Sequence, residues 1–174
     1  MSYLLSATIV LVALLSVIAL FGEAREMVKS SRRKAVKAET EKLVARAIEM
    51  NGQLHKIDSA SFQKLVVHVY EKIGYRAKVL TVGKERGIIL EQNGVYTLMI
   101  YKNHPWPMSK EILETCYYHK TKMGLDAMMV ISTYGFNASA WAWSKDQPEV
   151  KFINEERVVE LCKEIATLLK KETH

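Results

Sequence analysis

The chain has 174 residues, of which 49% are hydrophobic, and a formal net charge of +6 from 25 Lys and Arg against 19 Asp and Glu. This length favours one compact domain with an accessory segment. The charge is spread evenly, since residues 1–55 carry 8 Lys/Arg with 5 Asp/Glu and residues 56–174 carry 17 with 14. A single strongly basic domain is therefore excluded, and the mild positive excess permits nucleic acid or anionic lipid as a partner without requiring either.

The N-terminal segment, residues 3–22, contains no charged residue. A helix of about 20 such residues is long enough to cross the hydrocarbon core of a bilayer, so we predict a transmembrane helix here. The alternative is a cleaved signal peptide, but no basic residue precedes the run and no clear small-x-small cleavage site follows it. Basic residues follow the span, which predicts a single pass of the cell membrane with the N-terminus outside and the C-terminal domain in the cytoplasm.

Residues 23–51 are predicted to form a basic helical stalk, with apolar residues roughly on one side and the cluster Arg32-Arg33-Lys34. Two interpretations of the cluster remain open. It is either the orienting flank of a transmembrane helix or a contact surface for anionic headgroups or DNA. The apolar side also allows pairing with a second copy, in a homo-oligomer or a membrane protein assembly.

Residues 52–174 are predicted to form one α/β domain, because helical and alternating apolar patterns follow one another along the segment. The expected elements are a helix from Ser59 or Ser61 to Ile73, a strand at 76–82, a hairpin at 86–102, a helix from Ser109 to Gly124, a buried strand at 127–132, a helix at 136–144, a strand at 149–153 and a helix after Asn154. Three strands followed by helix–strand units imply a mixed sheet with helices on both faces.

The two cysteines, Cys116 and Cys162, fall at apolar positions of predicted helices. This placement favours buried, reduced thiols over a disulfide or a metal site. The five histidines show no pairing at the spacing of metal ligands, so the sequence predicts no histidine-based metal centre.

The strongest local signal is the hairpin, whose turn is predicted at Asn93-Gly94. A two-residue turn there places Gln92 opposite Val95 and Glu85 opposite Lys102, the last residue of the second strand. Two interpretations follow from this register. Glu85 and Lys102 form an ion pair, or Glu85 binds a metal ion from a position other than the usual one.

These features resemble the restriction-endonuclease-like, PD-(D/E)xK fold, and in particular the catalytic domain of Mrr-type type IV restriction endonucleases. The resemblance covers most of residues 59–162 and rests on the following segments: Ser61-Phe62-Gln63-Lys64 with Gly74-Tyr75, Ile100-Tyr101-Lys102, Val130-Ile131-Ser132-Thr133, Phe136 with Ala140, and Phe152-Ile153-Asn154 with Leu161. It implies a three-layer α/β domain and a DNA endonuclease that uses Mg²⁺, carboxylates and one lysine.

Only Lys102 matches the catalytic residues of that family. Gln63 stands where the family has a helix glutamate, and Ile100 stands where it has Glu or Gln before the lysine. The aspartate position falls on Ile89 or on Gly87, depending on the alignment. The resemblance therefore implies a degenerate site without a metal, in which Lys102 is a retained but vestigial catalytic residue.

The sequence leaves three functions to compare. The preferred one is a membrane-anchored protein that binds DNA and has lost cleavage. The candidate DNA contacts are Lys84, Arg86, Lys102, Lys110, Trp106, Arg32, Arg33 and Lys34. Trp106, in the segment His104-Pro105-Trp106-Pro107, either stacks on a base or covers the core. The alternatives are an active Mg²⁺-dependent endonuclease using Glu85 or Glu91 with Lys102, and a structural membrane protein whose domain binds protein partners only.

Overall fold

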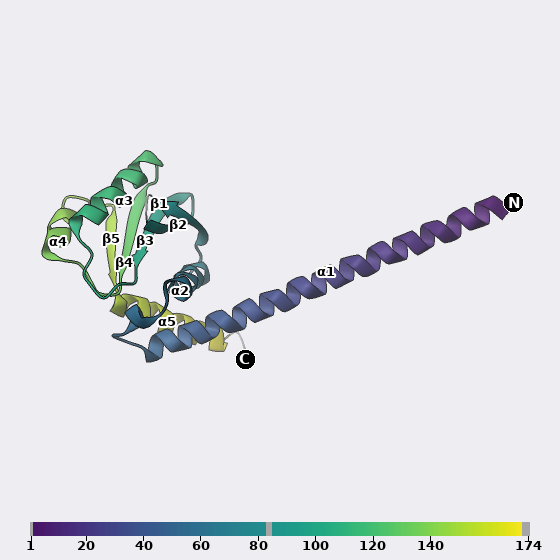
Figure 1. The fold of residues 1–174 in the computed structure, drawn as a ribbon, viewed down its shortest axis with the longest axis horizontal. Helices are drawn as coiled ribbons and strands as arrows, with labels where there is room; N and C mark the ends of the chain where they lie inside the picture. The colour runs from purple at the N-terminus through teal and green to yellow at the C-terminus, as the bar shows by residue number, and fades with distance from the viewer. Residues whose placement is uncertain (1, 83–84, 172–174) are drawn as a thin grey trace. The chain divides into compact units, whose positions relative to one another are not determined.

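The computed structural model covers residues 1–174 and describes the backbone of residues 2–82 and 85–171, with the side chains of residues 25–82 and 86–171 except Arg33. The chain forms two compact units, residues 1–39 and residues 40–174. Along the chain the elements are α1 Ser2–Glu49, η1 Leu54–Lys56, α2 Ser59–Lys72, β1 Arg76–Val82, β2 Glu85–Gln92, β3 Val95–Lys102, α3 Lys110–Lys122, β4 Ala127–Ser132, α4 Ala138–Ser144, β5 Val150–Asn154 and α5 Glu155–Lys171 (Figure 1).

The first unit contains the part of helix α1 up to residue 39. The segment predicted to cross a membrane, residues 3–22, is helical in its backbone, but its side chains lie outside the described residues. Where side chains are described, no helix is long and apolar enough to span a bilayer. Arg32 and Lys34 are exposed on α1, whereas the Arg33 side chain is outside the described set.

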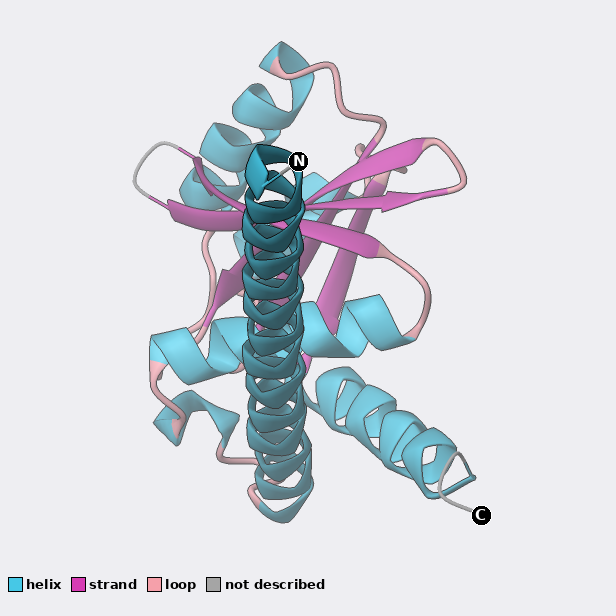
Figure 2. Cartoon of the chain, turned by 90° about the vertical axis from the view of Figure 1, so that its right-hand side faces the viewer, coloured by secondary structure: helices cyan, strands magenta, loops and turns pink. Residues whose placement is uncertain are grey.

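The second unit contains a five-stranded mixed sheet in the order β1-β2-β3-β4-β5. The pairs β1·β2 and β2·β3 are antiparallel, and the pairs β3·β4 and β4·β5 are parallel. Figure 2 shows these strands fanning out across the twisted sheet. This topology confirms the predicted mixed α/β fold. It also confirms the central, parallel position expected for the wholly apolar strand β4.

The hairpin has the predicted register. Asn93 and Gly94 both adopt positive φ, 54° and 80° respectively, as a two-residue hairpin turn of type I′ requires. Gln92 pairs with Val95 and Gly87 with Ile100. Because side chains alternate along a strand, this register fixes which face each hairpin residue occupies.

The helices begin and end close to the predicted residues. Helix α2 is capped by Asp58, whose carboxylate accepts a hydrogen bond of 2.9 Å from the Ser61 amide, so the cap is one residue before the predicted start. A hydrogen bond with the Ser61 hydroxyl, together with this bond from the Ser61 amide, lowers the pKa of Asp58. Helix α4 begins two residues later than predicted, after the cap Asn137.

Two hydrophobic clusters cover the two faces of the sheet. The first includes α2 and α5 together with Ile88, Met99, Tyr101 and Ile131, and the second includes α3 and α4 together with Leu98, Ile100, Met128 and Val130. The end of α1 also enters the first cluster, because Leu43, Val44 and Ala47 are buried there. The compact unit therefore includes the last part of the segment predicted as a stalk.

Both cysteines are buried thiols, as predicted. Burial raises the pKa of Cys162 to about 12. That thiol therefore stays protonated at neutral pH and behaves as a small apolar side chain.

Candidate nucleic-acid interface at the end of the hairpin

Lys102 is the last residue of β3 and is half-buried. It pairs with Ser132 of β4, which in turn pairs with Asn154 of β5, so the carboxyl ends of the three parallel strands are aligned. Its carbonyl accepts a hydrogen bond of 3.2 Å from the Thr133 amide. The Lys102 and Ile100 side chains lie on the same face of the sheet, because the two residues are two positions apart on β3. This face is covered by α3 and α4.

On that face lie the positions where the family that the sequence resembles has metal-binding residues, Ile100 and either Gly87 or Ile89, and none of them carries a side-chain oxygen. Ile89 is half-buried and pairs with Leu98 in the middle of the hairpin. Ile100 is fully buried. A Cβ added at Gly87 would lie 2.9 Å from Val82 Cγ2 and 3.3 Å from Ile100 Cδ1. Since real Cβ atoms do not approach other atoms so closely, the sheet and the Val82 side chain close the space where an aspartate would project.

The other face of the same hairpin end carries a polar cluster that sequence reasoning missed. The Tyr101 hydroxyl donates a hydrogen bond of 2.6 Å to Gln63 Oε1 on α2. Burial raises the pKa of Tyr101, and the nearby Arg86 guanidinium opposes that shift through its charge and a hydrogen bond to the hydroxyl. Gln63, Tyr101 and Arg86, here called the Tyr101 cluster, thus form a connected group on the α2 face.

These residues do not fit a Mg²⁺ ion. Mg²⁺ requires oxygen ligands in near-octahedral geometry, usually including carboxylates. Gly87 and Ile100 offer no side-chain oxygen, and Gln63 Oε1 already accepts the Tyr101 hydroxyl. Among the residues with described side chains, no group of three or more His, Cys, Asp or Glu could hold a metal ion.

Of Glu85 and Glu91, the two carboxylates that the nuclease alternative would use, only Glu91 has a described side chain. Glu91 pairs with Tyr96 near the turn, six residues along β3 from Lys102, which corresponds to about 20 Å of strand. Glu91 Oε2 lies 3.3 Å from Arg76 Nη1 on the neighbouring strand. The Glu85 side chain lies outside the described residues, so its ion pair with Lys102 stays a prediction.

The loop between β3 and α3 presents an exposed aromatic pair. The rings of His104 and Trp106 stack with centroids 5.4 Å apart and planes within 4°. Trp106 is 62% exposed, so the interpretation in which it covers the core is wrong. The loop is tied to the next one, because the Met108 amide donates a hydrogen bond of 3.0 Å to the Gly135 carbonyl.

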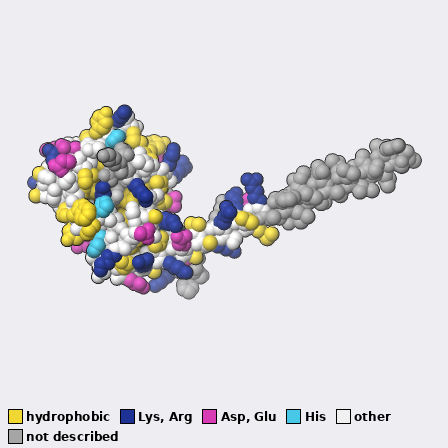
Figure 3. Space-filling model, in the orientation of Figure 1, with side chains coloured by type: hydrophobic (Ala, Val, Ile, Leu, Met, Phe, Trp, Pro, Cys, Tyr) yellow, Lys and Arg dark blue, Asp and Glu magenta, His cyan; other side chains and the backbone are white. Residues whose placement is uncertain are grey.

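The remaining predicted DNA contacts are dispersed. Arg86 is exposed at the same hairpin end as Lys102 but on the opposite face, and Lys110 begins α3, where it forms an ion pair of 3.3 Å with Glu114. Lys84 is outside the described residues. On the side of the molecule in Figure 3, Lys and Arg side chains of this unit are interspersed with Asp and Glu. On this side, a contact with phosphate would therefore rest on individual cations rather than on a continuous basic face.

A polar pocket of about 460 Å³ lies at the carboxyl ends of β4 and β5. Its lining residues include Asn51, Thr133, Tyr134, Asn154, Glu155 and Glu156. We call it the edge pocket. Sequence reasoning missed this site, although polar residues directly follow two neighbouring apolar strands. The carboxyl ends of parallel strands meet at one edge, which is where open α/β sheets bind ligands.

Comparisons with known proteins agree with the observed fold. The profile of the Mrr catalytic family, described as a restriction endonuclease, matches residues 54–162. Among solved structures, the DNA modification-dependent restriction endonuclease AspBHI is similar with a TM-score of 0.53 and 12% identity, over 71% of this chain and 35% of that chain. A protein of unknown function, AF1548, is similar with a TM-score of 0.46 and 14% identity, over 64% of this chain and 65% of that chain.

No match was found among curated proteins. The chain spans less than two thirds of each of these two solved structures. At this level of identity, the similarity to AspBHI shows the fold alone.

Proposed function

The chain belongs to the Mrr-type restriction endonuclease family, and on that premise we propose that it is a membrane-anchored protein that binds DNA without cutting it. The proposed DNA contacts are Lys102 and Arg86, on opposite faces of the sheet at the end of the β2–β3 hairpin, with Trp106 in the loop after β3 and Lys110 at the start of α3. Cations at this position neutralise phosphates and would supply the salt-dependent part of the affinity.

One observation carries the loss of cleavage. The hairpin keeps its terminal lysine, while Gly87 and Ile100 are closed by packing and Gln63 is held by Tyr101. Phosphodiester hydrolysis by this class of site requires a metal ion that activates water and polarises the phosphate. A lysine can hold a phosphate without a metal, so binding survives the changes that remove catalysis.

The membrane anchor is supported by the sequence. Residues 3–22 carry no charge, and the basic residues that follow them, with Arg32 and Lys34 exposed on α1, suit the cytoplasmic side of a bilayer. The Arg32-Arg33-Lys34 cluster would lie close to the membrane surface. It would contact anionic headgroups or DNA that approaches that surface.

Binding is tested with the purified full-length chain in detergent micelles and a fluorescent 20-base-pair duplex, followed by anisotropy at increasing salt. We expect Lys102→Ala and Arg86→Ala each to weaken binding roughly 3- to 10-fold and to lower the salt slope by about 1. Lys122→Ala is the matched control, because Lys122 is exposed in the last turn of α3, which leads to the start of β4, at the other end of the strand from the residue that pairs with Lys102. No duplex binding at low salt, or equal losses in all three variants, would refute the proposed interface.

Cleavage is tested separately by incubating supercoiled plasmid with the same protein and Mg²⁺ or Mn²⁺. We expect the plasmid to remain intact. Nicking that disappears in Lys102→Ala would establish the nuclease alternative, and Glu85→Gln and Glu91→Gln would then identify the carboxylate.

The anchor is tested by fractionating cells that express the full chain with a C-terminal tag. We expect the tag in the membrane fraction and digested by protease only after the cytoplasmic face is opened. Release of the chain by high-salt washing, without detergent, would contradict a transmembrane helix.

A further inference from the structure

Another pocket lies at the other end of the strands from Lys102, where β4 and β5 begin. Its volume is about 300 Å³. The lining includes Tyr75, Gln92, Thr97, Ala127, Met129 and Lys151. We call it the Lys151 pocket. Thr97 lies on the same strand as Lys102, at a distance of about 17 Å along that strand. The pocket therefore shares no residue with the proposed DNA interface.

The strand register shows that the Thr97 and Lys151 side chains project from the same face of the sheet. Met99 belongs to the cluster covered by α2 and α5, and Thr97 is two positions before it on β3. Ile153 packs against the same cluster, and Lys151 is two positions before it on β5. Because side chains alternate along a strand, both residues face the side on which the pocket lies.

Lys151 supplies the charge of the pocket. It is the one charged residue among the described residues of the lining, and its ammonium group forms no ion pair within the part of the chain that the structure describes. Asp126, just before β4, is engaged elsewhere, because its Oδ2 accepts a hydrogen bond of 2.7 Å from the Tyr96 amide. A lysine without a counter-ion beside a partly apolar pocket attracts an anion.

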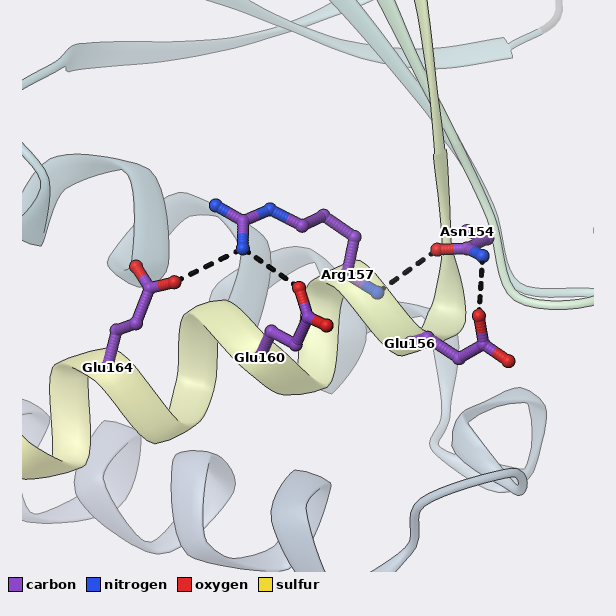
Figure 4. Close-up of polar contacts among 5 residues, drawn as sticks. All are labelled: Asn154, Glu156, Arg157, Glu160 and Glu164. Carbon is purple, nitrogen blue, oxygen red and sulfur yellow. Dashed lines mark hydrogen bonds and ion pairs between the residues drawn. The ribbon is translucent and has the colours of Figure 1, made fainter.

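The helix α5 covers the same face but does not neutralise Lys151. Its residues Glu160 and Glu164 both bond Arg157 Nη1, at 2.9 and 3.1 Å respectively (Figure 4). These carboxylates lie along α5 and are directed to that guanidinium group. The positive charge of Lys151 therefore remains available to a ligand.

Thr97 supplies a hydrogen-bonding group on the other side of the pocket. The residue is 8% exposed, and its hydroxyl forms no hydrogen bond with any residue that the structure describes, although it is not sealed from solvent. Thr97 pairs with Ala127, and Met129 pairs with Lys151. Thr97 and Lys151 are therefore two strand spacings, or about 10 Å, apart across the sheet and two residues, or about 7 Å, apart along it.

The charge and shape of the pocket define its ligand. One lysine balances one negative charge, which suits a carboxylate better than a phosphate monoester of charge about −1.5 to −2. Tyr75 and Met129 offer apolar surface, so an apolar body should carry the carboxylate. The floor of the pocket is a strand with the small side chain of Ala127, against which a flat ring can lie.

We propose that the Lys151 pocket binds a small aromatic monocarboxylate. The carboxylate contacts the Lys151 ammonium group, and a polar substituent at the opposite end of the ring bonds the Thr97 hydroxyl. 4-Hydroxybenzoate is the simplest compound with this arrangement. The inference goes beyond the proposed function and does not depend on it, because the two sites have no residue in common.

The test compares 4-hydroxybenzoate with 4-hydroxybenzamide, which has the same ring and hydroxyl but no charge. Binding of each compound to the full-length chain in detergent micelles is measured by calorimetry and saturation-transfer NMR, and the signal from empty micelles is subtracted. A charge-assisted hydrogen bond predicts that the acid binds roughly 10-fold more tightly than the amide. This comparison uses the unaltered chain, so it does not depend on the folding of any variant.

Three variants assign the groups. Lys151→Met removes the charge and keeps most of the apolar stem, so it should weaken 4-hydroxybenzoate roughly 10-fold and abolish the preference for the acid. Lys163→Met is the matched control and should leave both affinities unchanged, because Lys163 is exposed on α5 and does not line the pocket. Thr97→Val should weaken 4-hydroxybenzoate about 3- to 10-fold and leave the affinity for benzoate, which lacks the second polar group, unchanged.

Equal affinity for the acid and the amide, or no binding of either up to about 10 mM, would overturn the proposal. A preference for the acid that survives Lys151→Met would place the anion elsewhere and would also refute it. Tighter binding of inorganic phosphate than of 4-hydroxybenzoate would show that the apolar lining contributes nothing, with the same consequence. The Lys102→Ala variant should bind 4-hydroxybenzoate as the unaltered chain does. Failure of DNA binding therefore leaves this result intact, and failure of ligand binding refutes this inference alone.

Discussion

The end of the hairpin and the edge pocket lie two strands apart. Polar groups are hydrogen-bonded within the protein at the hairpin end, whereas the edge pocket contains one without a described partner. At the hairpin end, Gly87 and Ile100 are closed by packing and the Tyr101 hydroxyl is bonded to Gln63. In the edge pocket, the Thr133 hydroxyl has no partner among the described residues, and Glu155 and Glu156 face a hollow of about 460 Å³.

This difference distinguishes a packed, internally bonded region from one that leaves a buried polar group without a described partner. A packed site whose polar groups are hydrogen-bonded within the protein contributes to stability. Apart from the cations at its rim, it has few groups that a ligand can bind. A site with fixed but unsatisfied groups costs stability and can recover it on binding. We therefore expect removal of a hydroxyl to lower the free energy of unfolding at the hairpin end and to leave it unchanged or raise it in the edge pocket. We expect an added charge to have a much larger effect at the hairpin end.

The largest effect is expected from restoring a carboxylate at the hairpin end. Ile100→Glu places an unpaired charge in a fully buried position, and we expect it to lower the free energy of unfolding by about 3 kcal/mol or more. Urea denaturation followed by circular dichroism measures the change. Ile100→Val, which removes one methyl group, should cost only about 1 kcal/mol. A smaller loss in Ile100→Glu than in Ile100→Val would mean that the site is open enough for a metal ligand.

The next effect concerns the Tyr101 cluster. Tyr101→Phe removes the partner of Gln63 Oε1, bonded at 2.6 Å, and should destabilise the protein by about 1–2 kcal/mol. Tyr96→Phe, on the same strand, is the comparison, because Tyr96 is 47% exposed and its hydroxyl can bond water. Equal stability of the two variants would show that the cluster contributes nothing to folding.

Tyr101 should also make the free energy of unfolding decrease as the pH rises in the alkaline range. Burial raises the pKa of Tyr101, so its folded-state pKa lies above the unfolded value near 10. The stabilising contribution of its protonated form is therefore complete below about pH 10 and is lost as the pH rises through the folded-state pKa. Tyr101→Phe should make this decline shallower. Burial also raises the pKa of Tyr70, so part of the decline should remain. An unchanged slope, in thermal unfolding measured between about pH 8 and 11, would contradict the assignment.

The smallest effect, and the one with the opposite sign, is expected in the edge pocket. Thr133→Val removes a buried hydroxyl without a described partner and should leave stability unchanged or raise it by up to about 1 kcal/mol. Its neighbour provides the contrast. Ser132→Ala removes a hydroxyl that bonds the Gly135 carbonyl at 2.7 Å and should cost about 1 kcal/mol. Unfolding temperatures that fall equally in both variants would remove the distinction between the two regions.

Much of the fold follows from local sequence. The Asn93-Gly94 turn specifies the hairpin and its register because both residues tolerate positive φ. The uninterrupted apolar run of β4 predicts a strand buried on both faces. The sequence also shows that the catalytic pattern of the related family is incomplete. Lys102 is retained, whereas Gln63 and Ile100 stand at positions where that family has other residues.

The tertiary structure alone decided which polar groups meet. The Tyr101 cluster joins residues 63, 86 and 101, and the edge pocket joins a loop after α1 with the ends of β4 and β5. The exposure of Trp106 is likewise a property of the folded loop. Periodicity along the chain fixes which face of a strand or helix a residue occupies, because it arises from backbone geometry over a few residues. Which faces and strand ends come together depends on the order of strands in the sheet, and that order is set by packing between segments far apart in sequence.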